Sequence, residues 1–218
     1  MKKQEQMTAI FEDHLKEYEQ WFEDHPAILA TESAAFRELL PEGELHGIEI
    51  GSGTGHLALS IGLKEGVEPS DKLRAISVER GLEAIAGKAE DLPFKDLHFD
   101  FAVISTALHY LENIDKAFKE AYRVLKPTGS LLLGFLDPES IIGKEYIARR
   151  KQSTFYRNAD FYSIHTLERK LKAAGFKSLN FYQTLFGSTD EIAQVQKILP
   201  GTGMGSFILI QATKKTFS

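Results

Sequence analysis

The stretch IEIGSGTGHLALSIGLKEGVEP, residues 48–69, has glycines at three alternate positions directly after a short apolar run. These are Gly51, Gly53 and Gly55, and an acid, Glu68, follows near the end of the stretch. Glycine has no Cβ, so it adopts positive φ and lets a ligand approach the backbone, while a following helix offers free N–H groups. A tight turn between a strand and a helix needs fewer glycines than this. The pattern therefore indicates a ligand-binding turn.

The spacing of the glycines distinguishes between kinds of nucleotide-binding turn. The dinucleotide fingerprint G-x-G-x-x-G requires its third glycine where this chain has His56, whose imidazole would intrude on the path of the pyrophosphate. A P-loop would require Gly-Lys-Ser/Thr after the glycines, and that sequence does not follow. The spacing disfavours a nicotinamide-dependent oxidoreductase, which stays an alternative, and disfavours a P-loop protein more strongly.

Composition limits the classes of function. The 218 residues are 43% hydrophobic and 26% charged, as in a globular protein with one core. A net charge of −5 disfavours nucleic acid as a partner. No apolar run reaches the roughly 18 residues of a membrane span, and acids interrupt the first 22 residues, so we expect a cytoplasmic protein with no membrane segment. The absence of cysteine excludes disulfides and a cysteine nucleophile, and no histidine pair has i, i+4 spacing, so we predict no metal site.

Apolar periodicity predicts an α/β fold with a helical N-terminal cap. Residues 1–40 form the cap, with helical spacing interrupted at Pro26 and a second helix over 32–40. From about residue 45, short apolar runs alternate with helices, as in a parallel sheet built of βαβ units. The predicted strands are 46–50, 62–67, 82–88, 99–105 and 129–135, followed by a final antiparallel pair at 176–186 and 206–214. The predicted helices run from Ser70 to before Gly81, over 114–125, and from Ser163 to Gly175.

The pattern E-x-G-x-G-x-G, from Glu49 to Gly55, resembles the first motif of class I S-adenosylmethionine-dependent methyltransferases of the methyltransferase-11 or UbiE-like type. GVEPS (66–70), GKAEDLPF (87–94) and the stretch 99–135 are similar to the later motifs, in the same order. The resemblance implies a Rossmann-like three-layer αβα sandwich. Its sheet would be mostly parallel and seven-stranded, in the order 3-2-1-4-5-7-6, with an antiparallel C-terminal edge hairpin. The core would cover residues 41–218, with a substrate-lid insertion at about 137–162.

The same resemblance implies S-adenosyl-L-methionine as cofactor and S-adenosyl-L-homocysteine as product. Glu68 would accept both ribose hydroxyls, because an ionised carboxylate only accepts hydrogen bonds. Glu49 would lie near the amino group of the cofactor. Lys88 stands where the family often has the acid that receives the adenine amino group, so other residues of the same motif would replace it. The predicted cofactor-binding residues are Tyr18, Glu49, Gly51, Gly53, Gly55, Glu68, Pro69, Ala89, Glu90, Asp91 and Ser105.

His109 is the predicted catalytic residue. It follows the fourth strand, where the family has residues near the methyl group, and an imidazole titrates in the range of a general base. The alternative is a histidine packed in the structure. In the N-terminal helical stripe, Trp21 and Phe22 are expected to pack the cap onto the core and Tyr18 to contact the cofactor. The basic residues of the insertion are expected to form a solvated face, with recognition of an anion as the alternative.

These observations predict a methyltransferase that acts on a small molecule by in-line displacement at a nitrogen, oxygen or carbon nucleophile, as a monomer or homodimer. Orientation is the main requirement of such a transfer, and it can supply up to about 7–11 kcal/mol. The alternatives are an RNA or protein methyltransferase and a non-catalytic S-adenosylmethionine-binding protein. Cytosine C5 methylation through a cysteine is excluded, and the chain has no Pro-Pro as in amino-methylating DNA enzymes.

Overall fold

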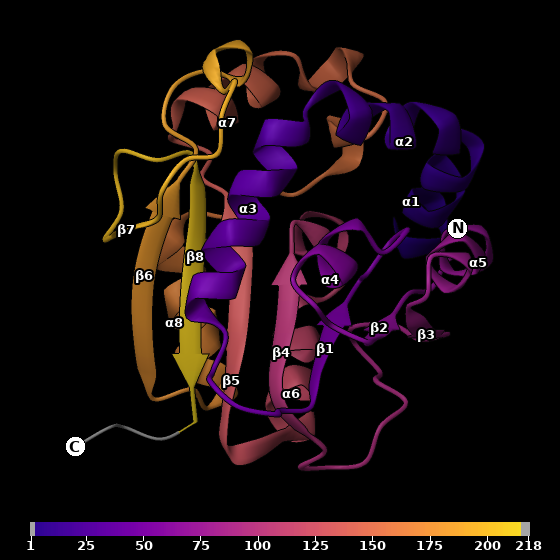
Figure 1. The fold of residues 1–218 in the computed structure, drawn as a ribbon, viewed down its shortest axis with the longest axis vertical. Helices are drawn as coiled ribbons and strands as arrows, with labels where there is room; N and C mark the ends of the chain where they lie inside the picture. Colours follow the sequence, from indigo (N-terminus) through magenta and orange to yellow (C-terminus); the bar gives the residue numbers. More distant parts are fainter. Residues whose placement is uncertain (1–2, 215–218) are drawn as a thin grey trace.

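A mixed sheet forms the centre of the computed structural model, which describes residues 3–214 (Figure 1). The strand order is β3-β2-β1-β4-β5-β8-β6-β7. Strands β1 to β5 pair in parallel, whereas β8 is antiparallel to β5 and β6, and β7 is antiparallel to β6. The strands are β1 (Gly47–Ile50), β2 (Glu65–Val67), β3 (Glu83–Ile85), β4 (Phe99–Ser105), β5 (Leu125–Leu136), β6 (Ser178–Thr184), β7 (Leu199–Pro200) and β8 (Phe207–Thr213).

The structure confirms the predicted α/β fold and the predicted order of seven strands, and it corrects their number to eight. The additional strand, β7, pairs with β6 through Leu199 and Pro200 alone. A proline has no N–H to donate to the hydrogen-bond ladder of a sheet, so it is confined to edge strands. A strand of two residues is also too short to show an alternating pattern, so it could not be predicted from the sequence. The predicted antiparallel pair is β6 and β8.

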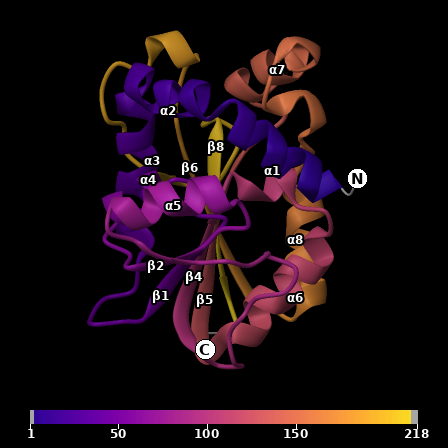
Figure 2. The ribbon, with the colours of Figure 1, turned by 90° about the vertical axis from the view of Figure 1, so that its right-hand side faces the viewer.

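Helices cover both faces of the sheet (Figure 2). One core cluster joins the sheet to α6 and α8, and a second joins it to α3 and α4. Along β5, Leu131 and Leu133 belong to the first cluster and Leu132 to the second, as the two-residue period of a strand requires. The helices are α1 (Lys3–Asp13), α2 (Leu15–Asp24), α3 (Pro26–Leu39), α4 (His56–Ser60), α5 (Asp71–Glu79), α6 (Ile114–Val124), α7 (Ile141–Ala148) and α8 (Ile164–Ala174), with 3₁₀ turns η1 (Ala107–Tyr110), η2 (Arg150–Gln152), η3 (Tyr156–Asn158) and η4 (Thr189–Glu191).

Side-chain caps begin three helices where the sequence predicts them. Ser70, Asn113 and Ser163 each accept a hydrogen bond from the backbone N–H three residues further on. The helix predicted from residue 32 begins earlier, at Pro26. Proline is well suited to the first turn of a helix, because its missing N–H has no intrahelical partner there and its φ is already helical. The prediction was wrong because it treated Pro26 only as an interruption.

The carboxyl ends of the parallel strands meet at one edge of the sheet, and two segments far apart in sequence cover this edge (Figures 1 and 2). Helices α1 and α2 approach it from the N-terminal segment, and α7, η2 and η3 from residues 137–162. Antiparallel β8 starts at the same edge, where Phe207 pairs with Leu136 at the end of β5. Open α/β sheets bind ligands at this edge, beside the point where strand order reverses.

Two further properties concern the part of the chain that the structure describes. None of its helices is long and apolar enough to cross a membrane. Within residues 3–214, no group of three or more acidic or histidine side chains is arranged to hold a metal ion.

Candidate active site

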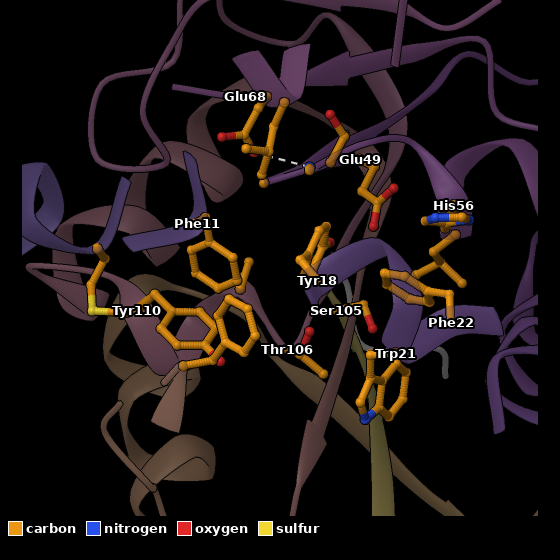
Figure 3. A pocket seen from close by; sticks show the side chains of 18 of the residues that line it. Phe11, Tyr18, Trp21, Phe22, Glu49, His56, Glu68, Ser105, Thr106 and Tyr110 are labelled. Carbon is orange, nitrogen blue, oxygen red and sulfur yellow. Dashed lines mark hydrogen bonds between the residues drawn. The ribbon is translucent and has the colours of Figure 1, made fainter. Parts of the chain in front are cut away.

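A cavity of about 240 Å³ lies at the carboxyl edge of the sheet, between the strand ends and the covering helices (Figure 3). The turns after β1 and β2 contribute Gly51 and Glu68 to its lining, and β4 contributes its last residue, Ser105. Helices α1, α2 and α3, together with α7 and η3, line the rest of it, largely with apolar and aromatic side chains. The cavity contains most of the predicted cofactor-binding residues, namely Tyr18, Glu49, Gly51, Gly53, Glu68, Pro69, Ala89 and Ser105.

The glycine turn requires glycine for two reasons, conformation and space. Gly51 and Gly53 have φ of +80° and +54°, in the left-handed region that side chains disfavour. A Cβ on Gly51 would lie 2.6 Å from the Cβ of Ala107, and one on Gly53 would lie 2.7 Å from the Tyr18 hydroxyl. Gly55, with φ of +85°, caps the start of α4 and does not line the cavity. The first two glycines therefore let other groups approach the backbone closely, whereas Gly55 shapes the turn.

Glu68 connects the end of β2 to the glycine turn. Its Oε2 accepts the Gly53 N–H at 2.9 Å, and its Oε1 accepts the Ser70 N–H at 2.9 Å. Burial raises the pKa of this carboxyl, while the two backbone N–H bonds act in the opposite direction. Each carboxylate oxygen has two lone pairs, so one on each oxygen is still free. The side chain lines the cavity and can accept two more hydrogen bonds there.

Glu49 is a second carboxyl in the same part of the cavity. Its side chain is 3% exposed, and its Oε2 has no hydrogen-bond partner among the described residues. Burial, together with the charge of Glu68, raises its pKa to about 8. A buried carboxyl oxygen without a partner is costly unless a cation or a donor binds it. The site therefore offers a place for a positively charged group next to the glycine turn.

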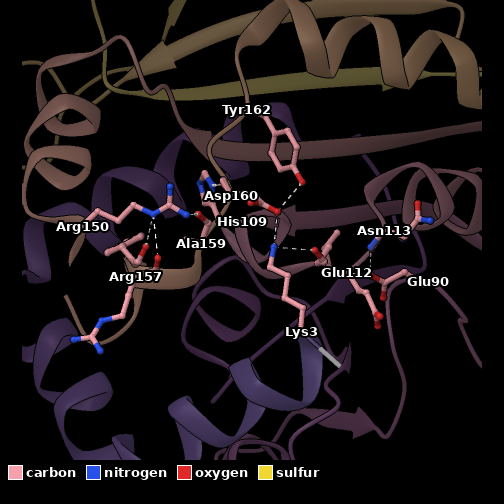
Figure 4. Close-up of polar contacts among 12 residues, drawn as sticks. Lys3, Glu90, His109, Glu112, Asn113, Arg150, Arg157, Ala159, Asp160 and Tyr162 are labelled. Atoms are coloured by element: carbon pink, nitrogen blue, oxygen red, sulfur yellow. Dashed lines mark hydrogen bonds and ion pairs between the residues drawn. The ribbon is translucent and has the colours of Figure 1, made fainter. Parts of the chain in front are cut away.

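Of the third motif, the two acids Glu90 and Asp91 lie outside the cavity lining. Ala89 lines the cavity. Glu90 accepts hydrogen bonds from the backbone N–H groups of Glu112 and Asn113, at 2.9 and 3.1 Å, and so holds the loop before α6 (Figure 4). Asp91 is exposed. The structure thus brings only Ala89 of these three predicted residues to the cavity.

His109 lies in η1, and the structure does not bring it to the cavity. Its side chain is 1% exposed, its Nδ1 donates to the Asp160 carbonyl at 2.6 Å, and burial lowers its pKa to about 4 (Figure 4). Ala107 and Tyr110 do line the cavity, because residues three apart share one side of a 3₁₀ turn. His109 is on another side of that turn. Its observed contact joins η1 to the insertion, where the Asp160 carboxylate also binds Lys3 of α1 at 2.5 Å.

Aromatic rings from the cap and the insertion form one wall of the cavity (Figure 3). The Tyr18 ring contacts Phe11 and Phe22 edge to face, with centroids 5.3 and 5.1 Å apart. Phe11 in turn stacks on Phe155 of the insertion at 5.0 Å. The Tyr18 hydroxyl also lies close to Gly53 of the glycine turn, and Trp21 and Phe22 line the cavity in addition to packing the cap.

Polar contacts also hold the cap closed over the strand ends. Glu19 of α2 forms an ion pair with Arg80 and lies 3.1 Å from Nε2 of His56. Glu12 of α1 accepts a hydrogen bond from the Ser70 hydroxyl at 2.7 Å. The ring of His56 also packs on Phe22, with centroids 4.0 Å apart. His56, which disfavours a dinucleotide site, thus helps to anchor the cap.

The basic residues of the insertion stay outside the cavity. Arg150 donates to the carbonyls of Tyr156, Arg157 and Ala159 and so stabilises the loop itself (Figure 4). The remaining four are exposed: Lys144, Arg149, Lys151 and Arg157. The basic residues of the insertion thus form a solvated face, as predicted.

The chain is similar to one group of proteins over almost its whole length. A crystal structure of an S-adenosylmethionine-dependent methyltransferase from Thermotoga maritima, described as a "possible histamine N-methyltransferase", has 41% sequence identity and a TM-score of 0.92. The match covers 95% of this chain and 99% of that one. The chain belongs to the S-adenosylmethionine-dependent methyltransferases.

Other matches agree with this membership. The family model named methyltransferase domain matches residues 48–133 of the methyltransferase. An uncharacterized protein of Methanocaldococcus jannaschii is 38% identical over 94% of this chain and 98% of its own length. The ubiquinone/menaquinone biosynthesis C-methyltransferase UbiE of Haemophilus ducreyi is 34% identical over 54% of this chain and 52% of its own length, so that match spans about half of each protein.

The cavity residues of the methyltransferase fit its cofactor, S-adenosylmethionine. Glu68 has lone pairs left for hydroxyl donors, and Glu49 has a buried oxygen with no partner, as an ammonium group requires. The motif that follows β3 contributes Gly87 and Ala89 to the lining, and neither of its acids. Sequence reasoning missed several lining residues that come from elements distant in sequence, namely Phe11, Glu32, Thr106, Tyr110, Tyr146, Phe155 and Tyr156. Thr106 has φ of +53°, a strain that no local sequence signal announces.

Proposed function

We propose that this methyltransferase transfers the methyl group of S-adenosylmethionine to a small molecule held inside the cavity. The observation that carries the proposal is the closure of the cavity by two separate segments, the cap and the insertion, whose Phe11 and Phe155 stack on each other. A long polymer would need an open groove, and an RNA would need a basic face. The cavity is instead lined by acids and aromatic rings, and the net charge of the chain is −5.

Each cavity residue has a role in this proposal. Glu68 accepts the ribose hydroxyls, Glu49 binds the amino group, and Gly51 and Gly53 leave space for the methionine part. Pro69, Ala89 and Ser105 line the cavity close to these groups. Tyr18 covers the glycine turn, and the closed cap excludes water. When bound, the cofactor supplies a methyl group on a positively charged sulfur, and the protein has to hold the acceptor in line with it.

The general base assigned to His109 from the sequence is not part of this proposal. A base must come within hydrogen-bond reach of the proton that it removes, and His109 does not line the cavity: its Nδ1 donates to the Asp160 carbonyl, and its Nε2 is buried with no partner among the described residues. Its lowered pKa of about 4 keeps the ring neutral at physiological pH. We assign it a positioning role, which is to hold η1 against the insertion.

The experiment is a transfer assay with S-adenosylmethionine labelled in the methyl group. The purified protein is incubated with fractions of small metabolites, with total RNA and with total protein, and the labelled products are separated by size. We expect label in small molecules. Label in RNA or protein would overturn the proposal in favour of a macromolecular substrate. Cofactor binding without transfer to any fraction would indicate a non-catalytic binding protein.

A further inference from the structure

The cavity has a second half, on the side away from Glu68. Helix α3 contributes Ile28 and Glu32 to its lining, which are one turn apart and so share one helix face. One turn further on, Phe36 packs edge to face on Phe207 of β8, with centroids 6.1 Å apart. Phe207 also lines the cavity, as does Leu136, its partner across β5 and β8. Glu32 is therefore located over β5 and β8, whereas the glycine turn and Glu68 follow β1 and β2.

Glu32 is a carboxyl without a partner. Its side chain forms no hydrogen bond or ion pair with any residue of the described part, 3–214, and burial raises its pKa to about 8. Tyr146 and Tyr156 line the same cavity, and the pKa of each phenol is raised, mainly by burial and in part by the charge of Glu32. The rings of these two tyrosines are 4.7 Å apart, and Trp21 lines the same cavity. This arrangement combines one acceptor group with several aromatic faces.

The chemistry of these groups selects a ligand class. A carboxylate binds N–H donors, and the electron-rich faces of tryptophan and tyrosine attract cations. A ligand that is itself an acid would be repelled by ionised Glu32, and no lysine or arginine of residues 3–214 lines the cavity to bind it. An alcohol brings no positive charge and so would not favour the ionised form of Glu32, whose pKa is raised. A nitrogen that carries protons suits both the carboxylate and the rings.

We propose that Glu32, with Trp21, Tyr146 and Tyr156, forms the acceptor subsite, and that the acceptor is a small amine whose nitrogen binds to the Glu32 carboxylate. This inference rests on the proposed function. The bound ammonium group first gives one proton to the Glu32 carboxylate, which frees the lone pair of its nitrogen. In the transfer, this lone pair forms the new N–C bond to the methyl carbon. The S–C bond breaks, and its electron pair stays on sulfur, which becomes a neutral thioether. The methylated nitrogen then carries the positive charge, and the proton held by Glu32 passes to water.

Glu49 does not take this role, although it also has an oxygen without a partner. It belongs to β1, beside the glycine turn and Glu68, so its free oxygen is on the cofactor side of the cavity. The cofactor and an amine acceptor each carry one amino group. The carboxyls of Glu49 and Glu32, in the two halves of the cavity, match these two groups.

The test uses Trp21, the only tryptophan of the chain, as a fluorescent reporter in the second half of the cavity. The wild type is compared with Glu32→Gln and with Glu38→Gln, a matched control at an exposed position of the same helix. Binding of S-adenosylhomocysteine is measured first by calorimetry, and we expect equal affinity in all three proteins. Primary arylalkyl and aliphatic amines, including phenethylamine, are then titrated into each saturated protein, together with the corresponding alcohols.

We expect amines to change the Trp21 emission of the wild type and of Glu38→Gln, and Glu32→Gln to weaken their binding at least tenfold. We expect the alcohols to bind weakly and equally to all three proteins. Three results would overturn the inference: equal amine binding by Glu32→Gln, alcohols that bind the wild type as tightly as amines, or no binding by any amine of the panel. Failure of S-adenosylhomocysteine to bind the wild type would instead contradict the proposed function.

Discussion

The hydroxyl of Tyr18 lies 2.7 Å from the position that a β-carbon on Gly53 would occupy. This relationship joins α2 of the cap to the turn after β1. The ring of Tyr18 cannot easily retreat, because Phe11 and Phe22 pack against it. Closure of the cap over the cofactor therefore depends on a glycine at position 53.

Gly53→Ala should separate these two elements. The methyl group collides with the Tyr18 hydroxyl, and φ of +54° adds backbone strain of about 1–2 kcal/mol. We expect the affinity for S-adenosylhomocysteine to fall at least tenfold by calorimetry. Gly62→Ala is the matched control, because Gly62 also has positive φ (+82°) but has open space around the added methyl group. Equal affinities of the two variants would show that the contact with Tyr18 does not matter.

Glu68→Ala should weaken binding of S-adenosylhomocysteine at least tenfold, because it removes the acceptor of the ribose hydroxyls. Charged hydrogen bonds of this kind contribute roughly 1.5–3 kcal/mol each. The substitution also leaves the N–H groups of Gly53 and Ser70 without partners, so we expect a lower stability with the fold retained. Calorimetry measures the affinity and circular dichroism the fold. Exposed Glu79 on α5 provides the control substitution, and unchanged affinity in Glu68→Ala would contradict the assigned role.

His109→Gln tests whether His109 acts through structure or through proton transfer. Glutamine can still donate to the Asp160 carbonyl but cannot serve as a general base. We expect kcat to fall less than tenfold and the free energy of unfolding to fall by about 1 kcal/mol. The measurements are steady-state kinetics and urea denaturation. A loss of a hundredfold or more in kcat with unchanged stability would instead restore the role of a base, whose removal typically costs 10²–10⁴-fold.

Glu32 should make the stability depend on pH. The pKa of its carboxyl is about 8 in the folded protein, against an ordinary value of 4.5. Between these two pH values the folded state keeps a proton that the unfolded state has released. The free energy of unfolding therefore falls as pH rises from about 4.5 to about 8, and this carboxyl causes no further loss above about pH 8. Glu32→Gln removes this contribution to the pH dependence of the free energy of unfolding. From about pH 5 to about pH 8, the free energy of unfolding of the variant should rise by about 1–2 kcal/mol relative to that of the wild type. One pKa unit corresponds to about 1.4 kcal/mol, and water in the cavity reduces the effect.

Urea denaturation at the two pH values measures this difference, with Glu38→Gln as the control. Other titrating groups, including Glu49 and the histidines, are common to all three proteins, so their effects cancel in the comparison. A difference between Glu32→Gln and wild type that stays constant with pH would show that Glu32 ionises normally.

Local patterns account for the parts of the fold that the sequence predicts well. Strand β4 has the predicted bounds, and α6 ends one residue before its predicted end, because a buried strand and a capped amphipathic helix each leave a strong pattern. Strand β3 is shorter than predicted and has exposed residues at both ends, Glu83 and Ile85. Strand β7 has no pattern of its own and depends on its pairing with β6.

The candidate site likewise has residues that the sequence predicts and residues that it does not. The glycine turn and Glu68 lie within one short stretch, so their spacing alone indicates that they meet. Glu32, Tyr146 and Phe155 meet only because α3 and the insertion fold over the same strand ends, and no spacing in the sequence encodes that encounter. His109 was assigned to the cavity because a single sequence does not show which side of a 3₁₀ turn faces inward. Tyr110, the next residue, lines the cavity instead.

A crystal structure with S-adenosylhomocysteine tests most directly the central claim that the cavity is divided between cofactor and acceptor. The account predicts the ribose hydroxyls on Glu68, the adenine beside Ala89 and the amino group on Glu49. It also predicts that the sulfur faces the half of the cavity that contains Glu32. Homocysteine bound at Glu32, or a ligand whose sulfur faces away from that half, would contradict it.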